Sequence, residues 1–234
     1  MTMAKTDAKE LTITVDASRR VSALLRAPAD ARACYVLAHG AGAGMRHPFM
    51  GAIAEALASR GIATLRYQFP YMENGSKRPD VPAVAHATVR AAVAEAARAM
   101  PNVSLVAGGK SFGGRMTSQA QAAAPLPDVR GLVFLGFPLH PAGKPSDERA
   151  AHLAEVRVPM LFLQGTRDDL ATLALMKPVA DRLGSIAQLV LFDDADHSFH
   201  VPARSGRKDA DVLALLADAI TGWIEASIPI VSRA

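Results

Sequence analysis

Residues 103–114 restrict the possible folds of this chain more than any other stretch, and they read Val-Ser-Leu-Val-Ala-Gly-Gly-Lys-Ser-Phe-Gly-Gly. The apolar run 103–107 is typical of a buried strand, and the pattern over 111–124 predicts a helix that ends before Pro125. Between them, residues 109–113 fit G-x-S-x-G, a sharp strand-to-helix turn that holds its serine in a strained conformation. Such a turn needs small flanking residues and exposes the serine hydroxyl at the edge of a sheet.

The same letters also resemble the end of a phosphate-binding loop, G-x-x-x-x-G-K-[ST]. That motif needs a glycine five residues before Gly109, where this sequence has Ser104 inside the predicted strand. Residues 105–107 are apolar and offer no glycine-rich cradle for a phosphate. We therefore expect no nucleotide binding at this segment.

Apolar runs that indicate strands alternate with helical patterns along most of the chain. We predict a hairpin over 11–15 and 21–25 and buried strands over 33–38, 62–67, 129–134, 158–163 and 188–192. Helices are expected over 48–60, 82–100, 173–183 and the apolar stripe from Val212 to Ile224, and a loop over 68–80. This alternation predicts an α/β protein of three layers, with a mostly parallel sheet, an antiparallel N-terminal hairpin and helices on both faces.

Length and composition favour one large core. Half of the 234 residues are hydrophobic and 21% are charged, so we expect a single domain over 1–234 with a flexible N-terminus at 1–9. The segment after Phe134 is too short for a full cap domain. The sequence does not indicate an oligomeric state.

Charge and cysteine usage narrow the class of partner and compartment. The net charge of +4 comes without a basic run interleaved with aromatic residues, so we expect no nucleic-acid partner. No apolar run approaches the roughly 18 residues of a membrane span, and the polar N-terminus does not resemble a signal peptide. Cys34 is the only cysteine, which excludes an internal disulfide and suits a reducing compartment. We expect a cytoplasmic protein without a membrane partner.

The carboxyl ends of the predicted strands carry the residue types that acyl transfer requires. Ser111, Asp168 and His197 follow three different strands in that order along the chain. A serine becomes a nucleophile when a histidine takes its proton and a carboxylate orients that histidine. Asp169 competes with Asp168 but equally suits a helix cap, and His200 competes with His197, which follows the acidic turn after the last strand. We predict a triad of Ser111, Asp168 and His197.

A tetrahedral intermediate also needs N–H donors for its oxyanion. We predict the backbone N–H of Phe112, directly after the nucleophile, as one donor. The second is expected from the glycine-rich loop 39–44, with Ala41 as first choice and Gly42 as second.

Further residues are expected near the substrate of such a site. We predict Gly42, Tyr71 and His140 as substrate-binding residues, and segments 69–72 and 137–140 as partial cover of a shallow, open site. The histidines show no metal-ligand pair on a helix, so we expect neither a metal nor another cofactor.

Four motifs together resemble the α/β-hydrolase superfamily, namely HGAGAG at 39–44, GKSFGG at 109–114, GTRD at 165–168 and ADHSF at 195–199. More narrowly, the chain resembles the small cap-less branch near dienelactone hydrolases. Within that branch it is similar to the hydrolase-like domain also found in a subunit of a chromatin-associated complex, through FPYM at 69–72 and GFPLHP at 136–141. Dienelactone hydrolases use a cysteine nucleophile where this chain has Ser111, so the resemblance implies a hydrolase but not its substrate.

The sequence thus predicts a serine hydrolase that acts on small-molecule carboxylic esters or thioesters through an acyl-enzyme. Two alternatives stay open. Acyl transfer to an acceptor other than water shares the same acyl-enzyme, and a non-catalytic hydrolase fold could serve to bind partners. Loss of a triad residue would favour the second alternative, and this chain retains all three.

Overall fold

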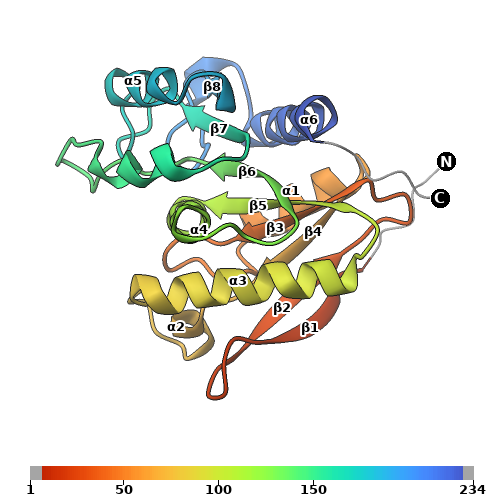
Figure 1. Cartoon of the computed structure of the whole chain (residues 1–234). Helices are drawn as coiled ribbons and strands as arrows, with labels where there is room; N and C mark the ends of the chain where they lie inside the picture. The colour runs from red at the N-terminus through yellow and green to blue at the C-terminus, as the bar shows by residue number, and fades with distance from the viewer. Residues whose placement is uncertain (1–6, 229–234) are drawn as a thin grey trace.

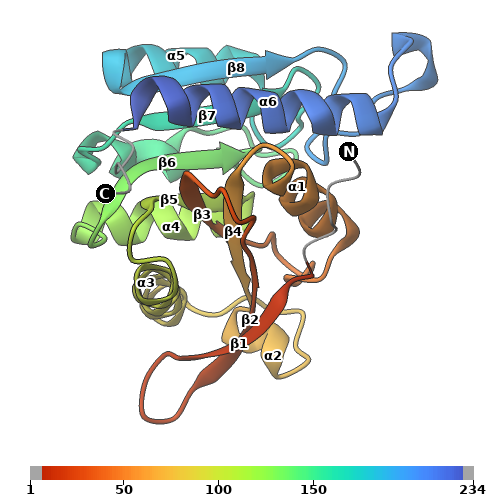
Figure 2. The same cartoon turned by 90° about the vertical axis from the view of Figure 1, so that its right-hand side faces the viewer.

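Within residues 7–228, which the computed structural model describes, the chain forms one eight-stranded sheet (Figures 1 and 2). Its order is β1-β2-β4-β3-β5-β6-β7-β8. The strands are β1 Lys9–Thr14, β2 Arg20–Arg26, β3 Ala33–Ala38, β4 Ile62–Tyr67, β5 Ser104–Lys110, β6 Val129–Leu135, β7 Met160–Gly165 and β8 Ala187–Phe192. β2 pairs antiparallel with both β1 and β4, and the remaining pairs are parallel. The predicted parallel sheet with an antiparallel N-terminal hairpin is confirmed.

Helices cover both faces of this sheet, as Figures 1 and 2 show. One face carries α1 (Pro48–Ala58) and α6 (Asp209–Ser227). The other carries α3 (Pro82–Ala99), α4 (Phe112–Ala123), α5 (Leu173–Leu183) and the 3₁₀ helix η1 (Glu148–Glu155). Two shorter 3₁₀ helices are η2 (Gly184–Ile186) and η3 (Ala203–Ser205).

Two hydrophobic clusters lie on opposite sides of the sheet and form the core. Neighbouring residues of β3 alternate between them, because successive strand side chains point to opposite faces. Val36 belongs to the cluster under α3 and α4, and Leu37 to the cluster under α1 and α6. Every residue of β3 is buried, which is why this strand reads as one continuous apolar run in the sequence.

The structure differs from the sequence prediction in three local elements. The predicted loop 68–80 contains the short helix α2 (Pro70–Glu73), because Pro70 has the φ that a first helical position needs. Residues 148–155, for which the sequence predicts no element, form η1. β5 continues past Ala107 to Lys110, since these residues keep their pairing with β3 and β6. Of the N-terminal segment expected to be flexible, residues 1–6 lie outside the described residues, and Lys9 already begins β1.

Close backbone contacts hold the turn between β5 and α4. Ser111 has φ 50° and ψ −116°, a region that residues other than glycine rarely adopt. A Cβ added at Gly109, where φ is +154°, would lie 2.3 Å from the carbonyl oxygen of Ala38. A Cβ added at Gly113 would lie 2.5 Å from the carbonyl oxygen of His39. Glycine at both positions therefore lets the turn pack directly against the end of β3.

We expect Gly109→Ala to lower the free energy of unfolding by about 3 kcal/mol or more. The new methyl group collides with the backbone of Ala38, and the positive φ adds strain. Gly222 in α6 is the matched control, because a Cβ added there has no neighbour within 4 Å. Gly222→Ala should raise stability by about 0.5–1 kcal/mol, since alanine is favoured inside a helix. Urea unfolding measures both changes, and a small loss at Gly109 would contradict the described packing.

Candidate active site

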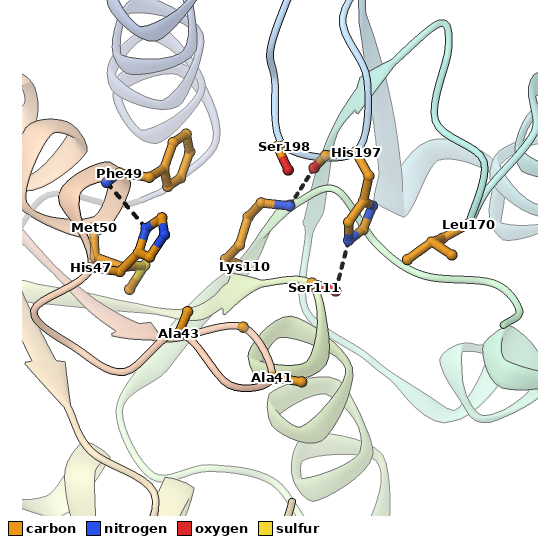
Figure 3. Close-up of a pocket in the computed structure, with 11 residues that line it drawn as sticks. Ala41, Ala43, His47, Phe49, Met50, Lys110, Ser111, Leu170, His197 and Ser198 are labelled. Atoms are coloured by element: carbon orange, nitrogen blue, oxygen red, sulfur yellow. Dashed lines mark hydrogen bonds between the residues drawn. The ribbon is translucent and has the colours of Figure 1, made fainter. Parts of the chain in front are cut away.

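Three of the predicted site residues meet at the carboxyl edge of the sheet. Ser111 follows β5, Asp168 follows β7 and His197 follows β8. His197 Nε2 lies 2.8 Å from Ser111 Oγ, as Figure 3 shows, and His197 Nδ1 lies 2.7 Å from Asp168 Oδ2. An ionised Asp168 can only accept, so Nδ1 carries the hydrogen and Nε2 is left to accept from the serine hydroxyl. In this arrangement the histidine can remove the proton of Ser111.

Three hydrogen bonds hold the Asp168 carboxylate in place. Its side chain is buried and, among the described residues, accepts hydrogen bonds from His197, from the Gln164 side-chain amide and from the Leu170 N–H at 2.8 Å. Asp169 is exposed and accepts no such hydrogen bond within residues 7–228. The structure therefore brings Asp168, and not Asp169, to the histidine.

His200 lies apart from this group. It is exposed, and its Nδ1 lies 2.9 Å from Asp209 Oδ2. The hydrogen bond to Asp209 raises the pKa of His200. Asp196 organises the turn that separates the two histidines, since its Oδ1 accepts from the N–H groups of Ser198 at 2.7 Å and His200 at 3.0 Å. The structure thus brings His197, and not His200, to Ser111.

The backbone N–H groups near the nucleophile differ in whether they are already bonded. The Gly42 N–H donates to Tyr71 Oη at 3.1 Å. The N–H groups of Ala41 and Phe112 donate to no acceptor within residues 7–228. Phe112 is the first residue of α4, so its N–H also lies at the positive end of that helix. Of the three N–H groups considered, those of Ala41 and Phe112 are therefore available to bind an oxyanion, whereas that of Gly42 already donates to Tyr71.

A pocket of about 350 Å³ adjoins Ser111 on the side of α1 (Figure 3). Its wall is formed by Gly40, Ala41, Ala43, His47, Phe49, Met50, Lys110, Ser111, Leu170, His197 and Ser198. The sequence prediction singled out only a few of these. Phe49 belongs to the helical spacing of α1, which did not reveal that it is half-buried at the pocket. Lys110 did carry a signal, because it stands inside the G-x-S-x-G motif.

The three residues predicted to bind substrate, Gly42, Tyr71 and His140, lie outside the wall of this pocket. Tyr71 is buried and holds the Gly42 N–H. His140 is also buried, and its Nδ1 lies 2.9 Å from the Pro141 carbonyl oxygen. Its backbone N–H donates to the Leu170 carbonyl oxygen at 3.1 Å. Their contact with a substrate stays a prediction.

His39 supports the loop that carries Ala41. It is fully buried, its Nε2 accepts from the Phe69 N–H at 3.1 Å, and its Nδ1 donates to the Gly40 carbonyl oxygen at 2.8 Å. Burial lowers the pKa of His39 to about 4, so the ring is neutral at pH 7.

Phe69 and Phe137, from the two segments expected to cover the site, are fully buried, so these side chains pack in the core instead of covering the pocket.

Three further features of the described part of the chain concern metal ligands, the cysteine and the helices. No three His, Cys, Asp or Glu side chains within residues 7–228 are placed to share a metal ion. Burial raises the pKa of the Cys34 thiol to about 12, which makes it inert at neutral pH. Among the described helices, none has the length and apolar character that a bilayer crossing requires.

Comparison with known proteins identifies the family. The family described as alpha/beta hydrolase domain matches residues 31–225. This chain belongs to the α/β-hydrolase family. Similar solved structures include a lidless α/β serine hydrolase from Xanthomonas campestris, with TM-score 0.73, 21% identity and coverage of 94% of this chain and 96% of that one. A dienelactone hydrolase from Anabaena variabilis has TM-score 0.76 and 21% identity, with coverage of 95% of this chain and 100% of that one. An esterase domain from Rhodothermus marinus has TM-score 0.73 and 16% identity, with coverage of 95% of this chain and 99% of that one. At these identities the likeness concerns the fold, and the predicted superfamily is confirmed.

We expect the stability of this α/β-hydrolase to fall as the pH falls from 6.5 to about 4, partly because of His39. Its pKa in the folded state, about 4, lies below the ordinary value of 6.5, so the unfolded chain binds a proton that the folded chain excludes. The stability linked to neutral His39 is fully present above pH 6.5 and is lost as the pH falls towards 4. The shift corresponds to at most about 3 kcal/mol.

Urea unfolding of His39→Gln at several pH values between 7 and 4 measures this contribution. The pH slope of stability should shrink without vanishing, because burial also lowers the pKa values of His86 and His152. An unchanged slope in His39→Gln would contradict the prediction.

Proposed function

We propose that this protein is a serine hydrolase that cleaves small-molecule carboxylic esters or thioesters. The hydrogen-bonded chain from Ser111 through His197 to Asp168 is the observation that carries the proposal. The unbonded N–H groups of Ala41 and Phe112 and the adjoining pocket support it. Membership of the α/β-hydrolase family agrees with this chemistry, as does the similar fold of a serine hydrolase and of an esterase domain.

The proposed reaction begins when Ser111 Oγ attacks the carbonyl carbon while His197 Nε2 takes the hydroxyl proton. Asp168 keeps the Nδ1–H of His197 in place and stabilises the imidazolium. The N–H groups of Ala41 and Phe112 bind the oxyanion of the tetrahedral intermediate. His197 then gives the proton to the leaving alcohol or thiol, and an acyl-enzyme remains.

The second half repeats these steps with water as the nucleophile. His197 takes a proton from the water as it attacks the acyl carbon, and then returns that proton to Ser111 Oγ. The carboxylic acid leaves, and the hydroxyl is restored. We assign Tyr71 a positioning role in both halves, because its hydroxyl accepts from Gly42 and so holds the loop that presents the Ala41 N–H.

A fluorophosphonate probe should label Ser111 covalently, and Ser111→Ala should abolish labelling and lower ester hydrolysis by about 10⁴-fold or more. Intact-mass and peptide mass spectrometry detect the adduct. The chain offers a matched control, because Ser118 Oγ lies 2.7 Å from His152 Nε2 and forms a second serine–histidine pair without a place in the pocket. Ser118→Ala should remain labelled. A wild-type protein that stays unlabelled at saturating probe would favour the non-catalytic alternative.

Asp168→Asn should lower kcat on a para-nitrophenyl ester by about 10⁴-fold, because an amide no longer fixes the tautomer of His197. Asp169→Asn should change kcat little, since Asp169 is exposed and does not contact the histidine. Steady-state kinetics at pH 7 compare the two variants. Equal losses, or the larger loss at Asp169, would refute the assignment of the acid while leaving Ser111 as the nucleophile.

A further inference from the structure

Lys110 places an ammonium group beside the proposed catalytic residues. Its side chain is half-buried and lines the pocket next to Ser111 (Figure 3). Nζ donates a hydrogen bond to the backbone carbonyl oxygen of His197 and lies 5.4 Å from the centre of the Phe199 ring. A Cβ added at Gly136 would lie 3.0 Å from Nζ, so the chain leaves space for this group. The pocket therefore contains a cation within reach of a bound substrate.

Lys110 Nζ makes a single hydrogen bond among the described residues and no direct ion pair. Lys110 forms no ion pair within residues 7–228, and the His197 carbonyl occupies only one of its three N–H donors. Burial lowers the pKa of Lys110 to about 8, and the charges of Asp168 and Asp196 only partly oppose that shift. At pH 7 the group is still mostly protonated. The other titratable side chains in the pocket wall are His47 and His197, neither of which supplies a negative charge.

The rest of the wall favours an apolar chain next to that charge. Ala43, Phe49, Met50 and Leu170 surround the space on either side of Lys110, as Figure 3 shows. Burial of this ammonium is only partly compensated by the charges of Asp168 and Asp196, so an anionic ligand group would stabilise it further. One ammonium with two available donors matches the single charge of a carboxylate, which accepts charge-assisted hydrogen bonds through its two oxygens.

We propose that Lys110 binds a carboxylate of the substrate, so that the preferred substrates are esters or thioesters carrying a carboxylate a few bonds from the scissile carbonyl. This inference rests on the proposed hydrolase function. The two remaining N–H donors of Nζ bind the carboxylate, and the short apolar segment between carboxylate and ester contacts Phe49, Met50 or Leu170. The carboxylate belongs either to the acyl part or to the leaving group, and the test separates these two sources.

Two matched substrate pairs provide the test, with wild type, Lys110→Met and Lys110→Arg compared at pH 7. The first pair is the para-nitrophenyl half-ester of glutaric acid and the corresponding para-nitrophenyl methyl diester, which differ in charge on the acyl side. The second pair is the acetate esters of para-hydroxybenzoate and para-hydroxybenzamide, which differ in charge on the leaving group. Comparing the ratio of kcat/KM within each pair across the variants cancels the intrinsic reactivity of each substrate.

Lys110→Met should lower kcat/KM for the charged member of one pair about tenfold more than for its neutral partner. Lys110→Arg should keep most of the preference, and the affected pair shows which side of the substrate carries the carboxylate. In the wild type the preference should fade as the pH rises through about 8, because Lys110 loses its charge there while the carboxylate keeps its own.

Equal losses on charged and neutral substrates would overturn the proposal and leave Lys110 only as a tether of the His197 carbonyl. No loss on either would overturn it as well. The neutral substrates test the hydrolase function independently, since their cleavage should depend on Ser111 whether or not Lys110 binds a carboxylate. Failure of the proposed function, seen as no cleavage of any substrate, is thus distinct from failure of this inference.

Discussion

The backbone contact between the end of β3 and the β5–α4 turn is the constraint on which the rest of the site depends. Gly109 and Gly113 approach β3 so closely that neither position has room for a side chain. This contact places the loop that carries Ala41 beside the strained Ser111, since a Cβ added at Gly40 would lie 3.7 Å from Ser111 Cβ. Rigid backbone therefore fixes both the proposed nucleophile and its proposed oxyanion donor, which is the preorganisation that acyl transfer requires.

The order of the parallel strands supplies the remaining groups. β6 separates β5 from β7, so Asp168 and His197 must reach across the end of β6 to meet Ser111. That strand ends at Leu135 and is followed by Gly136, where an added Cβ would lie 3.4 Å from His197 Cε1. The same Cβ would lie 3.0 Å from Lys110 Nζ and 3.3 Å from the His197 carbonyl oxygen, and the φ of +69° also favours glycine here. The small residue after β6 is thus part of what allows three separate strand ends to form one site.

Much of this arrangement could be predicted because its signals are local in the sequence. Apolar runs locate the strands, and the residues that follow them must meet at one edge of a parallel sheet. The choice between Asp168 and Asp169 depends on burial, which the sequence only suggests. The four residues of α2 are too few to show a helical period. Phe49 was placed correctly on a helix, but periodicity gives no information about which end of an apolar stripe opens onto a pocket.

Several features that lower the stability of the folded chain lie together at the carboxyl edge of the sheet. Ser111 holds a strained backbone, His39 is buried without a charge, and Lys110 carries a charge that forms no direct ion pair among the described residues. The two hydrophobic clusters on either side of the sheet offset these costs. Folding alone gives no reason for a strained serine and a partly compensated, half-buried ammonium to be adjacent in the chain. Their coincidence beside a pocket is what chemistry on a charged substrate would require, and it points to this edge independently of any family resemblance.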